Sequence, residues 1–163
     1  MINALLHPTL NHDQKRYILQ ETIIGIVISA LLSAFFVWLI FGDRNAVALW
    51  GEEGLALDFL PQTFMITFMC VLVPSLIARK KRRLGVVAAL SAPALRWLPT
   101  RLFLRALVLA FMATVVGSGC GVLILSLMPT PLSLNTVYLF KVIYGSVVAV
   151  CMAPVGLLAV LSE

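Results

Sequence analysis

Four long apolar stretches constrain this 163-residue chain more than any other feature of its sequence. A transmembrane helix needs about 20 predominantly apolar residues to cross about 30 Å of hydrocarbon. Four ranges meet this requirement: residues 17–41, 59–78, 102–128 and 136–161. We therefore predict an all-α membrane protein with four transmembrane helices.

The composition supports this prediction and excludes several other classes. Hydrophobic residues make up 61% of the chain and charged residues only 12%, against about 45–50% and about 25% in soluble domains. Such a chain cannot cover itself with a polar surface. We therefore expect residues 1–163 to form a single integral membrane domain, and we expect no nucleic-acid partner.

A fifth apolar stretch, residues 84–95, is too short to be a fifth span. It has about a dozen residues and contains Pro93, and runs of this length more often lie at the interface or re-enter the membrane. We expect a short cytoplasmic interfacial helix near 84–95, with a re-entrant loop as the alternative.

The basic residues predict the orientation in the membrane. All but two of the twelve Lys and Arg residues precede the first span, lie between the second and third spans, or lie at the start of the third. Cytoplasmic loops carry the excess of Lys and Arg, so we expect cytoplasmic N and C termini and an inner (plasma) membrane location. Five of these residues are consecutive: Arg79, Lys80, Lys81, Arg82 and Arg83. They act as a topology signal or, alternatively, contact anionic lipid headgroups.

The four spans form two hairpins that enter from the same side, and the hairpins resemble one another. A shift of 85 residues places Arg16 on Arg101, and a shift of 80 places Pro74 on Pro154. These matches suggest parallel repeats, residues 15–79 and 100–161, related by an axis along the membrane normal. Any two apolar helices align to some degree, so a chance similarity stays an equal alternative.

Small residues recur at every fourth position in three of the spans. Such rows let helix backbones approach closely in membranes, where they form packing faces. An alternative is that they line a path for a solute or a lipid. The rows are Gly25, Ser29 and Ser33; Ala113, Gly117 and Gly121; and Gly145, Ala149 and Ala153. Pro74 and Pro154 lie inside spans and predict kinks.

Ionisable groups inside spans are candidates for function. Glu21 lies about one turn inside the first span, where Arg105 is the expected partner. Lys141 lies inside the fourth span at the level of Asp58, and it either pairs with Asp58 or extends toward the interface. A solute path, if present, would add Thr114 and Ser118 to Ser29 and Ser33.

No group of residues indicates catalysis, a metal or a cofactor. The three cysteines form no CxxC pair, both histidines precede the first span, and no hydrolase, metalloprotease or phosphate-loop motif is present. We therefore expect a non-enzymatic bundle, either a homo-oligomer or an accessory subunit of a larger membrane complex. The alternative is a channel or transporter for small solutes or ions, with its path between the hairpins.

Overall fold

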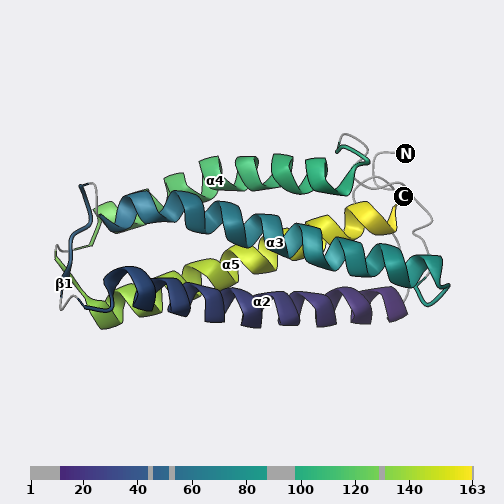
Figure 1. Cartoon of the computed structure of the whole chain (residues 1–163), viewed down its shortest axis with the longest axis horizontal. Helices are drawn as coiled ribbons and strands as arrows, with labels where there is room; N and C mark the ends of the chain where they lie inside the picture. The colour runs from purple at the N-terminus through teal and green to yellow at the C-terminus, as the bar shows by residue number, and fades with distance from the viewer. Residues whose placement is uncertain (1–11, 44–45, 52–53, 88–97, 129–130, 163) are drawn as a thin grey trace.

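The computed structural model describes residues 12–43, 46–51, 54–87, 98–128 and 131–162, and within them the chain is almost entirely helical (Figure 1). The elements are α2 (His12–Phe41), β1 (Ala46–Val47), α3 (Leu55–Arg83), α4 (Leu102–Ser126), β2 (Leu132–Ser133) and α5 (Leu134–Leu161).

The helices confirm the four apolar stretches. All four are long and apolar enough to cross a membrane. The third helix, α4, ends at Ser126, two residues before its expected end, whereas α3 continues through the basic run to Arg83. Residues 84–87, where we placed the start of an interfacial helix, form a turn with Gly85 at φ +72°. The rest of that stretch, residues 88–95, lies outside the described residues.

The two helices of each predicted hairpin pack only sparsely against one another. Helix α2 packs along α5, and α3 packs along both α4 and α5, whereas the α2–α3 and α4–α5 pairs share few contacts. In Figure 1, α2 and α4 form opposite edges of the bundle, with α3 and α5 between them. Each sequential hairpin therefore contributes one outer helix that packs mainly against the other hairpin.

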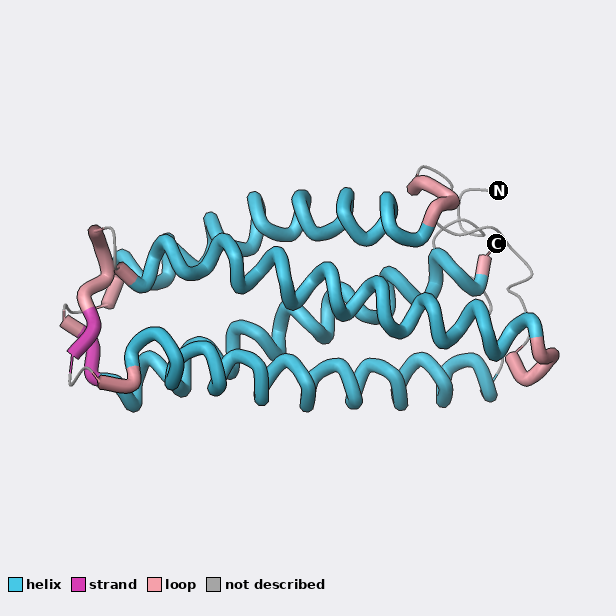
Figure 2. The backbone as a smooth tube through the Cα atoms, viewed as in Figure 1, coloured by secondary structure: helices cyan, strands magenta, loops and turns pink. Residues whose placement is uncertain are grey.

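Two short strands join the loops at one end of the bundle. In Figure 2 they lie where α2 ends and α5 begins. They pair antiparallel, with Ala46 opposite Ser133. Ser133 also caps α5, because its Oγ accepts a hydrogen bond from the backbone N–H of Thr136 at 3.4 Å. This pairing ties the loop before α3 to the loop before α5.

The small-residue rows lie largely inside the bundle. A Cβ added at Gly121 would lie 2.9 Å from the Phe59 ring, and one at Gly145 would lie 3.0 Å from Ile66 Cδ1. Gly25, Ser29, Ser33, Ala113, Ala149 and Ala153 are also buried, and Gly117 is partly buried. A Cβ at Gly145 would also meet Ser33 Oγ of α2. Glycine is therefore needed where α4 approaches α3 and where α5 approaches both α2 and α3.

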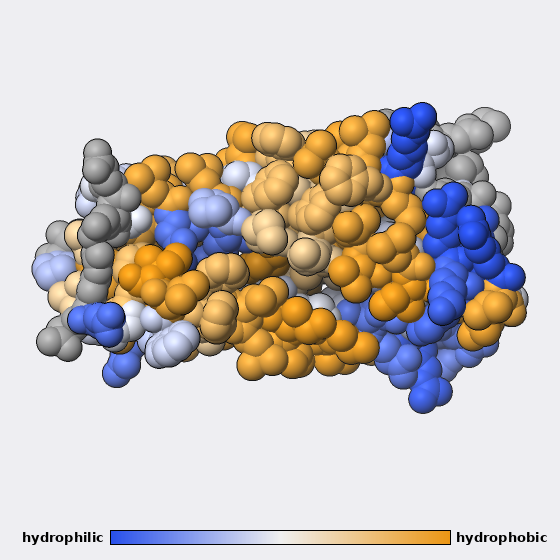
Figure 3. All heavy atoms as spheres, in the orientation of Figure 1, coloured by the Kyte–Doolittle hydropathy of each residue, from blue (hydrophilic) through white to orange (hydrophobic). Residues whose placement is uncertain are grey.

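Polar and apolar side chains separate along the bundle axis. Figure 3 shows an apolar belt around the middle and a hydrophilic right-hand end. That end carries Lys15, Arg16, Arg79, Lys80, Lys81, Arg82, Arg83, Arg101 and Arg105. Large apolar residues such as Leu31, Val115 and Leu139 are exposed along the belt. This distribution is compatible with a bundle whose centre is surrounded by hydrocarbon.

A buried polar layer as the candidate functional site

The most deeply buried charge in the described part of the chain is Lys141 of α5. Its side chain has 0% exposure and forms an ion pair with Asp58 in the first turn of α3. The Nζ atom also lies 5.6 Å from the ring centroid of Phe41 and 5.9 Å from that of Phe59. Of the two arrangements expected from the sequence, pairing with Asp58 is the one present.

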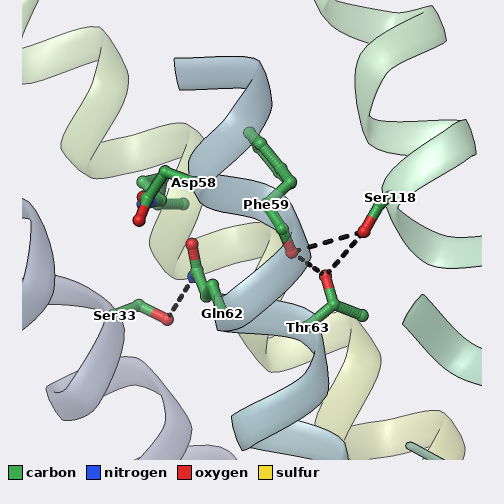
Figure 4. A network of polar contacts seen from close by, with 7 residues as sticks. Ser33, Asp58, Phe59, Gln62, Thr63 and Ser118 are labelled. Atoms are coloured by element: carbon green, nitrogen blue, oxygen red, sulfur yellow. Dashed lines mark hydrogen bonds and ion pairs between the residues drawn. The ribbon is translucent and has the colours of Figure 1, made fainter. Parts of the chain in front are cut away.

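Gln62 extends this polar group toward α2. It lies one helical turn after Asp58 on α3, is 5% exposed, and donates from Nε2 to Ser33 Oγ at 3.0 Å (Figure 4). Its Oε1 atom has no hydrogen-bond partner within the described residues. The side chain thus links α3 to the edge helix α2, with which α3 otherwise shares few contacts.

A second polar group links α3 to α4 and α5. Thr63 Oγ1 donates to the backbone O of Phe59 and also lies 2.6 Å from Tyr144 OH. Ser118 Oγ of α4 donates to the same Phe59 O at 3.3 Å and lies 3.5 Å from Thr63 Oγ1. Figure 4 shows Gln62 directed toward Ser33 and Thr63 directed toward Ser118. Consecutive residues of α3 therefore fasten opposite sides of the bundle.

Further polar contacts lie between this layer and the basic end of the bundle. Ser29 Oγ of α2 lies 3.3 Å from Cys70 Sγ of α3. Ser75 Oγ donates to the backbone O of Gly156 at 3.4 Å. Ser75 follows Pro74 directly on α3, and Gly156 lies two residues after Pro154 on α5. Both prolines lie inside helices that continue past them.

The four hydroxyl residues that we expected along a path do not come together. Ser29 and Ser33 contact α3 from one edge of the bundle, and Ser118 contacts α3 from the opposite side. Thr114 donates to the Ala110 carbonyl of its own helix at 2.7 Å. It lines an outward-facing groove of about 500 Å³ together with Trp50 and Ser118, so two of the four hydroxyl residues share this groove and the other two lie elsewhere.

At the basic end, Glu21 pairs with a different residue from the one we predicted. Its Oε1 lies 3.3 Å from Lys81 Nζ of α3, whereas Arg105 Nε donates to the backbone O of Pro99 at 3.0 Å. Glu21 and Arg105 belong to α2 and α4, which occupy opposite edges of the bundle. Arg82 Nη1 donates to the Val160 carbonyl at 2.8 Å and thereby satisfies a group in the last turn of α5.

Two cavities lie beside the polar layer, where consecutive helices separate. One, of about 250 Å³, lies between α2 and α3 and is lined by residues that include Asp58, Gln62 and Phe36. The other, also about 250 Å³, lies between α4 and α5 and is lined by residues that include Gly117 and Tyr144. Both follow from the sparse contact within each sequential hairpin.

Sequence reasoning missed Thr63 and Tyr144. The available signal was the spacing of polar residues along α3, where Asp58 and Gln62 are four residues apart, as are Thr63 and Thr67. Two polar stripes on adjacent faces of one apolar helix indicate contacts with two different helices.

The layer contains no metal-binding chemistry among the described residues, where no three His, Cys, Asp or Glu side chains gather. The three cysteines are free thiols. No protein-family model matches the chain, and comparisons with curated proteins and with solved structures find no similar protein.

Proposed function

We propose that this chain is a non-enzymatic, multi-pass protein of the bacterial inner (plasma) membrane. It acts as a helical bundle that assembles with copies of itself or as an accessory subunit of a larger membrane complex. The length and apolarity of the four helices support membrane insertion, and so does the apolar middle beside the hydrophilic end in Figure 3.

The charge distribution supports cytoplasmic N and C termini. The end where α2 begins and α5 ends carries most of the basic residues, whereas the loop end carries Asp43 and the Asp58–Lys141 pair. Under the positive-inside rule the basic end faces the cytoplasm. The run Arg79–Arg83 then lies at the level of the headgroups, where each basic residue attracts anionic lipid by about 1 kcal/mol.

The observation that carries this proposal is that the buried polar groups bond to one another and so join the helices of the bundle. Lys141 is neutralised by Asp58, Gln62 is bonded to Ser33, and Thr63 is bonded to Tyr144. Hydrogen bonds and close packing of small residues hold helices together in lipid, where burial of apolar groups gives little driving force. These contacts account for most of the layer as a means of fastening four helices; they leave Gln62 Oε1 without a partner among the described residues.

The particle extracted from native membranes tests this proposal. The protein would be solubilised gently, its particle mass measured, and every chain in the particle identified, with the extraction repeated in a second mild detergent. We expect a closed homo-oligomer or a particle with stoichiometric foreign subunits. A monomer in both detergents would contradict the proposal.

A transport function is the second candidate, and the exchanged packing of the hairpins favours it. Exchanging α2 with α4 and α3 with α5 maps the α2–α5 contact onto the α4–α3 contact. This is the pattern expected of two parallel repeats, residues 15–79 and 100–161, and transporter halves are related in this way. The closely packed pairs, α2 with α5 and α3 with α4, would then be two rigid units that move relative to one another at the contact between α3 and α5.

Flux into proteoliposomes tests the transport candidate. Ser29→Leu places a large side chain against Cys70 at the centre of the bundle, and we expect it to abolish flux while leaving the particle mass unchanged. Ser126→Leu, at an exposed position near the end of α4, is the matched control. Equal flux in both variants would count against a path at this interface.

A further inference from the structure

We propose that a pocket at the basic end, between the start of α2 and the end of α3, binds the phosphate of a phospholipid headgroup. The pocket has a volume of about 440 Å³ and is lined by polar residues that include Arg16, Tyr17, Gln20 and Lys81. The inference rests on the proposed function only in placing this end at the cytoplasmic headgroups.

Lys81 is held in position for an anion before any ligand binds. Its Nζ lies 3.3 Å from Glu21 Oε1 and 4.5 Å from the centroid of the Tyr17 ring. An ammonium group has three N–H donors, so the contact with Glu21 leaves others available to the pocket. Fixing this long side chain in advance lowers the entropic cost of binding.

The turn after α3 fixes the opposite wall of the pocket. The backbone N–H of Val86 donates to the Lys81 carbonyl at 3.0 Å, and the N–H of Gly85 donates to the Arg82 carbonyl at 3.0 Å. Gly85 adopts the left-handed conformation that this helix ending requires. The wall formed by Gly85, Val86 and Val87 is thus tied to the residue that supplies the cation.

Arg16 supplies the second cation, and Gln20 adds an uncharged donor. A guanidinium binds phosphate through two parallel N–H donors. Gln20 lies one turn further along α2, on the same face as Arg16. Tyr17 also lines the pocket, and the centroid of its ring lies 4.5 Å from Lys81 Nζ.

The acidic residues around the pocket favour a phosphate diester over a dianion. Asp13 lines the pocket, and Glu21 offsets the charge of Lys81. Directional donors are therefore gathered without a large net positive charge. A phospholipid diester carries one negative charge, whereas inorganic phosphate and phosphate monoesters carry nearly two. The second charge would lie close to Asp13.

Titration of the full-length protein in detergent tests the site. The probes are short-chain dihexanoyl phosphatidylglycerol, dihexanoylglycerol without phosphate, and sodium phosphate. We expect the phospholipid to bind, and we expect Arg16→Gln to weaken binding about tenfold, the loss of one charge-assisted contact. Lys15→Gln removes the same charge from the preceding, exposed residue outside the pocket, and we expect it to change affinity less than about twofold.

A second pair of variants, one inside the pocket and one outside it, keeps the test from depending on Arg16→Gln alone. Lys81→Gln should weaken binding like Arg16→Gln, and Lys80→Gln should not. Binding of sodium phosphate as tight as that of the lipid would overturn the lipid assignment and make a free anion the source of the phosphate. Equal losses in the Arg16 and Lys15 variants, equal binding of dihexanoylglycerol, or no binding of any probe would overturn the inference. None of these results depends on particle composition, so failure of this site and failure of the assembly proposal are distinguishable.

Discussion

Lys141 of α5 is fully buried and forms an ion pair with Asp58 of α3, so the two central helices are joined by opposite charges near the loop end of the bundle. Taking both ions out of water is costly, and their attraction offsets this cost only while both are present. The pair therefore contributes more to the arrangement of α3 and α5 than to the net free energy of folding.

Breaking this pair should destabilise the protein strongly. Lys141→Met leaves the Asp58 carboxylate without its cation, and we expect a loss of about 3–5 kcal/mol, measured by denaturation of the purified protein in detergent. The double variant Lys141→Met with Asp58→Leu should recover much of this loss, because it removes both charges. Asp43→Asn, at an exposed position, serves as the control and should leave stability unchanged. A double variant no more stable than Lys141→Met would argue against a mutual pair.

The glycines of α4 should respond differently to alanine. A Cβ at Gly121 would lie 2.9 Å from the Phe59 ring, so Gly121→Ala should cost about 1–3 kcal/mol of stability. Gly119, two residues earlier on the same helix, has open space where its Cβ would be. Gly119→Ala should be neutral or should stabilise by up to about 1 kcal/mol. Thermal unfolding of the two variants, measured side by side, checks the packing of α4 on α3. A Gly119→Ala variant less stable than Gly121→Ala would show that a different face of α4 packs on α3.

The hydrogen bond between Thr63 and Tyr144 should be measurable by a double-mutant cycle. Thr63→Val and Tyr144→Phe each remove one hydroxyl while keeping most of the side-chain volume. We expect a coupling energy of about 0.5–2 kcal/mol, the range of interhelical hydrogen bonds in membranes. Thr114→Val is the matched control, since Thr114 bonds only to its own helix. A coupling energy of zero would mean that the two hydroxyls do not bond.

Disulfide cross-linking can test the exchanged packing of the hairpins. A Cβ at Gly25 would lie 3.8 Å from Ala153 Cβ, a separation typical of disulfides. In a chain whose native cysteines are replaced by alanine, Gly25→Cys with Ala153→Cys should cross-link α2 to α5 within one chain. Gly25→Cys with Gly119→Cys joins opposite edges of the bundle and should not cross-link within one chain. The reverse result would mean that the edge helices are adjacent.

The sequence was sufficient to predict the helices and much of the interior. Apolar length alone located the four helices, because a span must be about 20 residues long. The spacing of small residues indicated the buried faces, since close approach in lipid requires them. Counting residues inward from each helix end also placed Lys141 and Asp58 at the same depth along the bundle axis.

The neighbours of each helix could not be predicted in the same way. The sequence suggested two hairpins, whereas the helices within each hairpin share few contacts: α2 packs on α5, and α3 packs on α4 and α5. That choice decides that Glu21 meets Lys81 and not Arg105. It also decides which face of α3 contacts α4 and α5, and therefore that Thr63 lies against Ser118 and Tyr144. The rotation of a helix about its axis depends on such contacts between residues distant in the sequence.

The central claim is that the bundle spans the membrane with its basic end in the cytoplasm. Labelling of single cysteines in spheroplasts with a membrane-impermeant maleimide tests it most directly. Asp43→Cys and Arg83→Cys place a thiol at exposed positions on opposite ends of the bundle, in a chain whose native cysteines are replaced by alanine. We predict that the cysteine at 43 is labelled in intact spheroplasts and the cysteine at 83 only after lysis. Labelling of position 83 from outside, or of both positions without lysis, would contradict the account.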